Sequence, residues 1–256
     1  MKSLERAIDI LFSFSGEHTT RTPAEIAAAV EIPVSSVYRF LKTFERRGLV
    51  ELDRRTGTYS LGYDVLMLES AVRKKIGLDK ITKPILDKVA SITRETVQIT
   101  ILNKDHGFLL FAEESPIPPR FAPEFGFPMP LYAGCTVQVI MAYLPESIRE
   151  RIINGGLKKF GPRSITSPDV LRARLREIRG QGYAISFEEF YPGSKGIAFP
   201  FFRSENRIVG SLAVSAPIER FDSEKERQVI ALLAEESVRI SKRITAQDGY
   251  DPKLVI

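Results

Sequence analysis

Residues 22–61 read TPAEIAAAVEIPVSSVYRFLKTFERRGLVELDRRTGTYSL, and their pattern predicts two short helices, a tight turn and a charged hairpin. Thr22 is a typical N-cap residue, Pro23 suits the first helical position, and Glu25 completes a capping box. The first helix is expected to end at Ile32-Pro33, because the residue before a proline avoids helical backbone angles. The stretch therefore opens with one short, alanine-rich helix.

A second helix is predicted from about Val34. Its apolar residues recur at helical spacing and form one inward stripe, made of Val37, Phe40, Leu41 and Phe44. Gly48 suits the left-handed position just past the helix end. The outer face carries small hydroxyl groups, one tyrosine and several cations: Ser35, Ser36, Tyr38, Arg39, Lys42, Thr43 and Arg46. Ordinary surface helices alternate Glu with Lys, so this composition favours contacts with phosphates and base edges.

The hairpin that follows has a basic tip. Strands are predicted at 49–52 and 58–61, on either side of a turn over 53–57. Helix, turn, helix and basic hairpin together predict a winged helix-turn-helix that binds duplex DNA. The candidate DNA contacts are Thr22, Ser35, Ser36, Tyr38, Arg39, Lys42, Thr43, Arg54 and Arg55. The alternative is a charged face that is merely solvated, as on many surface helices.

The composition is that of an ordinary globular protein. Its 256 residues are 43% hydrophobic and 27% charged, enough for two modest domains with a buried core. A net charge of +5 weakly favours a polyanionic partner. One cysteine excludes an internal disulfide framework and indicates a reducing compartment, and with only two histidines no metal site is expected. The charged amino terminus lacks the features of a signal peptide, and no apolar run reaches the ~18 residues of a membrane span, so a cytoplasmic protein without membrane contact is expected.

Four segments are predicted along the chain. They are the winged helix-turn-helix domain or head (1–61), a linker helix (62–77), a ligand-binding domain (78–245) and a polar tail (246–256). The linker has apolar residues with little to cover inside the small head, namely Val65, Leu66, Leu68 and Val72. They are expected to pack against a partner chain. In the first helix, Ile8 and Leu11 are expected to pack within the head.

The ligand-binding domain is predicted to be α+β. Helices are expected at 81–94, 133–144, 145–153, from Ser167 to about Gly180, and at 222–243. Strands are expected at 97–102, 108–113, 183–187, 197–202 and 208–215, with a proline-rich loop at 115–130. Helices around a mostly antiparallel sheet are a common way to enclose a small ligand.

At this point the sequence resembles the IclR family of bacterial and archaeal transcription regulators. The resemblance rests on the order of four segments: TPAEIA (22–27), IPVSSVYR (32–39), PLYA (130–133), and GYA (182–184) continuing through Glu188-Glu189 to Pro192-Gly193. The last segment runs on into IAFP (197–200) and VSAP (214–217). The resemblance implies a winged helix, a linker helix and an effector domain akin to the GAF fold. It also implies dimers, often paired into tetramers.

The resemblance also implies an effector site. Matched position by position, the residues that contact small oxoacids in such relatives fall here on Cys135, Thr136, Ser186, Gly196, Ala213 and Ser215. Family members commonly carry His-Ala-Thr-Ala-Ser-Gly-Lys where this chain has YAGCTVQ (132–138), so the histidine and the Gly-Lys pair are lost. An acidic residue and a cysteine of the relatives are Ser186 and Gly196 here, which puts glyoxylate-type recognition in doubt.

Two features of this region bear on the kind of ligand. The hydroxyls of Thr136, Ser186 and Ser215, with amides at the start of the helix, are able to hold a carboxylate. Seven rings suit a larger, aromatic ligand, with packing in the core or a lid as the alternative: Phe121, Phe125, Phe127, Tyr132, Phe187, Phe190 and Tyr191.

No catalytic residue is assigned. Cys135 has no histidine partner, since His18 lies in the head and His106 in a hairpin turn. Glu188 and Glu189 are adjacent, and neighbours in a strand face opposite ways. No triad, metal cluster or phosphate loop is present in the sequence, so no enzyme activity and no cofactor are expected.

The function predicted is a DNA-binding transcription regulator that acts as a homodimer on a roughly palindromic operator. Binding of a small organic acid in the carboxy-terminal domain is expected to change operator binding. The alternative is a ligand-binding sensor or enzyme domain whose head serves protein association.

Overall fold

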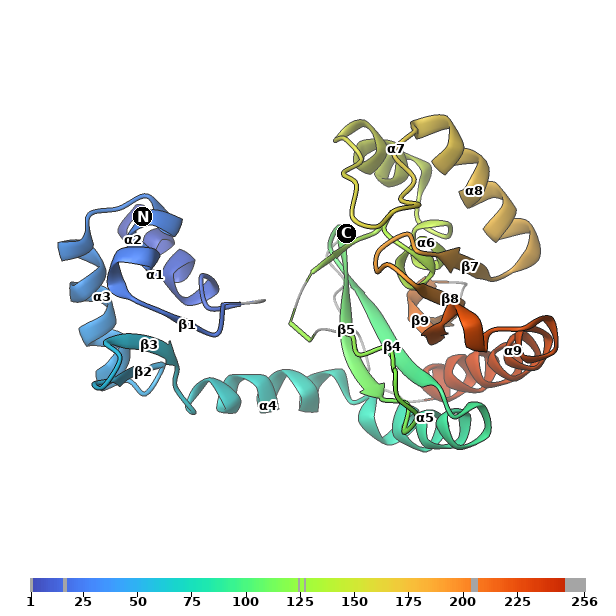
Figure 1. The fold of residues 1–256 in the computed structure, drawn as a ribbon, viewed down its shortest axis with the longest axis horizontal. Coiled ribbons are helices and arrows are strands. Elements are labelled where there is room, and N and C mark those ends of the chain that lie inside the picture. The colour runs from blue at the N-terminus through green and yellow to red at the C-terminus, as the bar shows by residue number, and fades with distance from the viewer. Residues whose placement is uncertain (1, 16–17, 124, 127, 204–206, 247–256) are drawn as a thin grey trace. The chain divides into compact units, whose positions relative to one another are not determined.

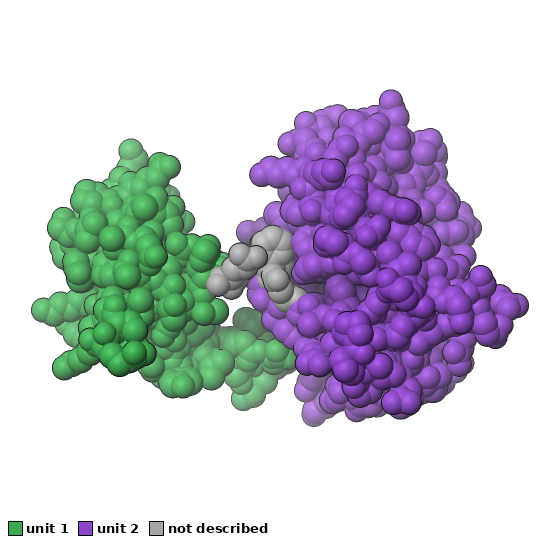
Figure 2. All heavy atoms as spheres, viewed as in Figure 1, with its two compact units in different colours: residues 1–76 green, residues 77–256 purple. Residues whose placement is uncertain are grey.

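The computed structural model describes residues 2–15, 18–123, 125–126, 128–203 and 207–246. The chain forms two compact units, unit 1 over 1–76 and unit 2 over 77–256, coloured separately in Figure 2. The linker helix groups with the head in unit 1. The polar tail from 247 on, and Phe127, lie outside the described residues.

Unit 1 is a helix-turn-helix with a small sheet (Figure 1). Its described elements are α1 (Lys2–Phe12), β1 (Thr20–Arg21), α2 (Pro23–Val30), α3 (Val34–Arg46), β2 (Val50–Asp53), β3 (Thr58–Leu61) and α4 (Val65–Ile76). The strands are antiparallel in the order β1-β3-β2. The sequence pattern missed β1, because a two-residue strand has no periodicity and exists only through its pairing with β3.

The helix boundaries in the head follow local chemistry. The predicted capping box is confirmed: the amide of Glu25 donates to Thr22 Oγ1 at 3.3 Å, and the amide of Thr22 donates to Glu25 Oε2 at 2.7 Å. Helix α2 ends because Glu31 adopts the left-handed conformation, with φ 55°. Gly48 has φ 65° just after α3, where a side chain would be strained and would collide with Asp64.

The core of the head lies between α1, α2, α3 and the sheet. It is built from Ile10, Phe14, Ile26, Ala27, Ile32, Val37, Leu41, Val50 and Tyr59. Leu11 packs against this core as expected, but Ile8 is exposed. In α1, the exposed apolar residues Leu4, Ile8 and Phe12 recur every four positions and so form one stripe on the helix surface.

Unit 2 is built around one antiparallel sheet. Its described elements are α5 (Asp79–Thr93), β4 (Thr96–Asn103), β5 (His106–Glu113), β6 (Met129–Pro130), α6 (Cys135–Met141), α7 (Glu146–Asn154), α8 (Pro168–Gln181), β7 (Ala184–Phe187), β8 (Ser194–Arg203), β9 (Arg207–Pro217), a 3₁₀ turn (Ile218–Arg220) and α9 (Ser223–Ala246). The strands follow the order β6-β5-β4-β9-β8-β7. This confirms the predicted α+β class.

Helices cover both faces of this sheet. Figure 1 shows α5 and α9 on one side and α6, α7 and α8 on the other. The short side chains Ala198 and Ala213 are paired across β8 and β9 and belong to the core that contains α6. The hydroxyl of Ser211 donates to the carbonyl of Thr136 at 2.6 Å, which fixes the start of α6 on β9. Among the described residues, no helix is long and apolar enough to span a bilayer.

Candidate functional site

The outer face of α3 is the first candidate site. Ser35, Arg39, Lys42 and Arg46 follow one another at spacings of four, three and four, so they form a single exposed line along the helix. Tyr38 is 54% exposed beside this line. The buried side chains Val37 and Leu41 face the opposite way, into the core of the head.

The cations of this face have no acidic partner among the described residues. In the described part of the chain, Arg39, Lys42 and Arg46 take part in no ion pair. By contrast, Arg172 and Arg220 of unit 2 are held by carboxylates. At the start of α3, Pro33 supplies no side-chain cap, and the first amides of a helix have no partner within it. Unpaired cations and open helix amides together suit a phosphate backbone.

Two predicted DNA contacts already have other partners. The hydroxyl of Thr22 is bonded to Glu25 in the capping box, and the hydroxyl of Thr43 donates to the carbonyl of Arg39 at 3.2 Å. Each keeps at most acceptor capacity for a DNA group. Thr22 therefore serves first to begin α2, which sequence reasoning did not separate from a role in DNA contact.

The hairpin between β2 and β3 presents the other two arginines. The Asp53 side chain accepts from the amide of Arg55 at 2.8 Å, and this bond lowers the pKa of Asp53. The amide of Gly57 closes the turn onto the carbonyl of Asp53 at 2.8 Å. Arg54 and Arg55 are both exposed at this tip and enter no ion pair in the described chain. The tip is therefore a hydrogen-bonded turn that presents two guanidinium groups without ion-pair partners in the described chain.

The second candidate site is a cavity in unit 2, an empty space of about 580 Å³ when its open mouth is included. Five of the six residues matched to the effector site line it, namely Cys135, Thr136, Ser186, Gly196 and Ser215. Ala213 does not line it. It lies two residue pairs further along β9, fully buried in the core with α6.

Gly196 makes room for this cavity. A Cβ atom there would lie 2.7 Å from the sulfur of Cys135 and 3.2 Å from the hydroxyl of Ser215. The missing side chain therefore brings β8 close to the start of α6 and leaves the polar groups around one small space.

Gln98 is a cavity residue that the sequence pattern did not reveal. Its side-chain amide on β4 donates to Ser215 Oγ on β9 at 2.9 Å, and both side chains are buried. The hydroxyl proton of Ser215 is then free to point into the cavity. A side-chain amide flanked by the apolar residues Val97 and Ile99 was the available signal.

Glu189 also lines the cavity and was not assigned to it. Burial raises the pKa of this carboxyl, while Arg174, 3.6 Å away, and the side-chain amide of Gln138 oppose the rise. Glu188 turns the other way, with φ 48°, and accepts from the amide of Gly193. The two carboxylates diverge, as expected, although at a bend after β7 and not within a strand.

The charged group of Lys195 is unavailable to a ligand in the cavity. Its ammonium is paired with Glu226 of α9 and lies 4.7 Å from the ring centre of Phe187. Polar recognition in the cavity therefore depends on hydroxyl and amide groups.

Aromatic rings form one wall. Phe121, Phe190 and Tyr191 line the cavity, and Tyr191 contacts the other two rings with centroids 5.2 and 4.8 Å away. Of the other rings considered, Tyr132 is buried in the core, while Phe125 and Phe187 are exposed. The aromatic wall therefore contains fewer residues than the seven that the sequence offered.

Cys135 is a packed thiol. It is 3% exposed, and burial raises its pKa to about 12, with a hydrogen bond to Ser186 opposing the rise. Since the thiolate is the nucleophile, this environment makes the thiol inert at neutral pH.

We expect Cys135 to react slowly with Ellman's reagent in the native protein at pH 8, and rapidly in guanidinium chloride. The raised pKa also predicts that the free energy of unfolding falls as pH rises above about 9, the ordinary value, because only the unfolded chain ionises there. Stopped-flow labelling in both solvents measures the difference. Fast labelling in native buffer would contradict this environment.

These two sites define a class: a winged helix-turn-helix head joined to a domain with a cavity lined by polar and aromatic side chains, as in ligand-responsive regulators of transcription. Residues 3–54 match the IclR helix-turn-helix domain, and residues 70–242 match the family described as bacterial transcriptional regulator IclR C-terminal. The chain belongs to the IclR family. It is a DNA-binding transcription regulator with a carboxy-terminal effector-binding domain, and not an enzyme.

Three relatives illustrate the similarity. The HTH-type transcriptional regulator BhcR of Paracoccus denitrificans is 31% identical over 222 residues, covering 86% of this chain and 79% of that protein. The solved IclR regulator of Alicyclobacillus acidocaldarius is 27% identical with a TM-score of 0.84, covering 94% and 98%. An IclR homolog of Microbacterium hydrocarbonoxydans, solved with 4-hydroxybenzoate, has a TM-score of 0.84 at 22% identity, covering 96% and 100%; at that identity only the fold is shared.

Proposed function

We propose that this regulator binds a roughly palindromic operator as a homodimer and that a small organic acid, with an aromatic ring, changes that binding. The observation that carries the effector proposal is the cavity itself. Its lining combines hydroxyl and amide groups with aromatic rings. The operator contacts are assigned to the outer face of α3 and to the hairpin tip.

The hydroxyl groups around Gly196 and at the start of α6 suit a carboxylate. Ser186 and Thr136 bring hydroxyls to the cavity, and Ser215 has a free proton because it accepts from Gln98. Hydrogen bonds to a charged group are among the stronger ones. Glu189 is held by Arg174 and Gln138, so the acid group of the ligand is assigned to the hydroxyls and the ring to Phe121, Phe190 and Tyr191.

The dimer is assigned to the exposed apolar residues of unit 1. Leu68 and Val72 of α4 lie four positions apart on one side of the helix and are 62% and 55% exposed. With Val65 they have the three-and-four spacing of a helix–helix seam. The stripe of α1 (Leu4, Ile8, Phe12) adds a second exposed apolar surface. Such grouped apolar exposure is typical of an interface.

The effector is tested by ligand titration. In a thermal-shift assay, benzoate and 4-hydroxybenzoate are expected to stabilise unit 2 and glyoxylate is not, since only a ligand of the native state raises Tm. Ser215→Ala and Thr136→Val are expected to weaken binding of the responding acid about tenfold or more. Ser237→Ala, a buried serine of α9 away from the cavity, is the matched control and is expected to bind normally.

The same acids are then added to a gel-shift assay with DNA from upstream of the protein's own gene, over a salt series. A change in operator affinity with the acid that stabilises the protein is the expected result. Stabilisation by glyoxylate alone would overturn the aromatic class. No DNA shift at low salt would favour a head used for protein association.

A further inference from the structure

The segment over 114–123, here called the strap, is held in an unusual way. It leaves β5 and contributes Phe121 and Pro123 to the cavity wall. In the described chain it is not paired as a strand. Its backbone polar groups are bonded by side chains instead. The position of the strap therefore depends on the positions of those side chains.

Residues at the junction of α5 and β4 bind Ser115 and Phe121 of the strap. Ser115 Oγ donates to the carbonyl of Arg94 at 2.7 Å, and the amide of Ser115 donates to Thr96 Oγ1 at 3.1 Å. Thr96 Oγ1 in turn donates to the carbonyl of Phe121 at 2.5 Å. These contacts hold the two ends of the strap.

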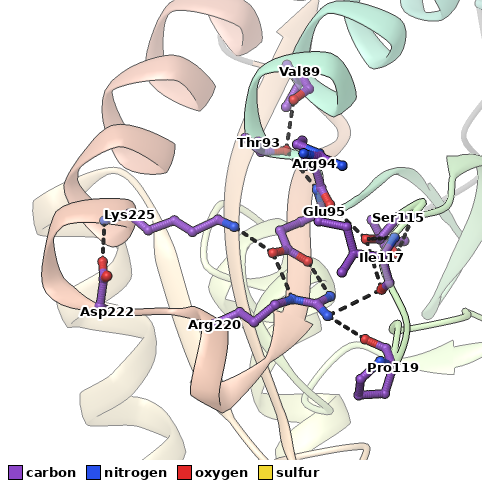
Figure 3. A network of polar contacts seen from close by, with 11 residues as sticks. Val89, Thr93, Arg94, Glu95, Ser115, Ile117, Pro119, Arg220, Asp222 and Lys225 are labelled. Atoms are coloured by element: carbon purple, nitrogen blue, oxygen red, sulfur yellow. Dashed lines mark hydrogen bonds and ion pairs between the residues drawn. The ribbon is translucent and has the colours of Figure 1, made fainter.

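Arg220 holds the middle (Figure 3). One of its nitrogens, Nη1, donates to the carbonyls of Ile117 at 3.3 Å and Pro119 at 2.5 Å. Its other two nitrogens form a two-pronged pair with Glu95, at 3.0 and 2.6 Å. Lys225 adds a second cation to Glu95 at 2.5 Å without a bond to the strap in the described structure.

The buried carboxylate determines the direction of the guanidinium. Glu95 is 0% exposed, and a carboxylate in such a place must be paired and hydrogen-bonded. The guanidinium group is planar and its donors form a fork. When two nitrogens of Arg220 bind Glu95, the direction of the third nitrogen is therefore fixed. That direction is toward the strap carbonyls. Lys225 balances charge but, as a point cation, imposes no such direction.

We propose that Arg220 is a positioning residue for the effector cavity. Arg220 is paired with Glu95 and fixes the position of the strap. It thereby places Phe121 against Tyr191 in the cavity wall. Its role in effector binding rests on the proposed function of that cavity. The placement of the strap itself does not, and it is tested without ligand or DNA.

Trypsin provides the test in the natural sequence. Arg120 is the only trypsin site in the strap, and its backbone lies between two held carbonyls. Arg220→Gln is expected to speed cleavage at Arg120 about tenfold by opening the strap locally. Cleavage at the exposed wing residues Arg54 and Arg55 serves as the internal reference and is expected to stay unchanged.

Lys225→Gln is the matched control, because it removes the other cation from the same carboxylate. It is expected to lower Tm as Arg220→Gln does while leaving cleavage at Arg120 slow. Equal acceleration by both variants would overturn the proposal, since general destabilisation would then explain the cleavage. Unchanged cleavage in Arg220→Gln would overturn it as well.

A second variant covers the case in which Arg220→Gln does not fold. Arg220→Lys keeps a cation beside Glu95 but has one nitrogen, which cannot serve both the carboxylate and the two carbonyls. It is expected to accelerate cleavage at Arg120, and protection equal to wild type would overturn the proposal.

Because the chain has no tryptophan, Phe121→Trp adds a single reporter whose acrylamide quenching is expected to rise about twofold in the Arg220 variants.

Discussion

Leu68→Glu is expected to yield a folded protein that is monomeric and fails to retain operator DNA at physiological salt. The side chain is 62% exposed on α4 and contributes nothing to the core of the head. A charge at this position would be buried without a partner in the proposed helix seam. Two linked heads gain about 10²–10⁴ in affinity over one, and that gain is lost with the dimer. Light scattering measures the halved mass, and a gel shift measures the lost binding.

Leu66→Glu provides the control on the same helix. The sequence grouped Leu66 with Val65, Leu68 and Val72 as residues expected to contact a partner chain, but Leu66 lies two positions from Leu68 on α4 and therefore on the opposite side of the helix. Its side chain is 59% exposed, nearly as much as that of Leu68. Leu66→Glu is expected to leave the dimer and its DNA binding intact. A Leu68→Glu protein that remains dimeric, or a Leu66→Glu protein that dissociates instead, would move the seam to another face.

Arg39→Ala is expected to weaken operator binding by about 1–3 kcal/mol and to relax base preference at one position. Arg39 lies at the centre of the exposed line on α3 and is not committed to any carboxylate in the described chain. Lys42→Ala is expected to weaken all DNA sequences alike and to reduce the salt slope by about 1, as the loss of one phosphate contact would. Fluorescence anisotropy with operator and scrambled duplexes, over a salt series, separates the two results.

Arg6→Ala is the matched control for these variants. It removes one cation from the same head, from an exposed position on α1. Wild-type operator affinity is expected, apart from a small change shared by all sequences. If Arg39→Ala and Arg6→Ala behave alike, the outer face of α3 is not the surface that recognises bases.

Features that depend on neighbouring residues were predictable from the sequence. The capping box of Thr22 and Glu25 joins residues three positions apart. The two faces of α3 follow from the helical period alone. Element boundaries were displaced by up to three residues, as with β8, predicted from Ile197 and beginning at Ser194. The candidate DNA contacts could therefore be predicted as a group, although only the structure revealed that Thr22 and Thr43 have bonds of their own.

The membership of the cavity depended on the sheet. Gln98 and Ser215 lie 117 positions apart and meet because β4 and β9 pair side by side. Ala213 was matched to the site by position, yet the register that places Ser215 at the cavity puts Ala213 in the core with α6. Glu189 was considered only for catalysis, because its burial beside Arg174 depends on packing between distant segments.

By itself, the sequence determined the class of fold, the outward face of α3 and the basic hairpin tip, since turns, caps and helical faces arise from contacts within a few residues. Only the tertiary structure decided which polar groups share the candidate effector cavity and which side chain bonds the strap beside it. Glu95 and Arg220 are separated by 125 positions, and no local pattern relates them. They are joined because burial of a carboxylate demands a partner, and the folded sheet brings Arg220 to it.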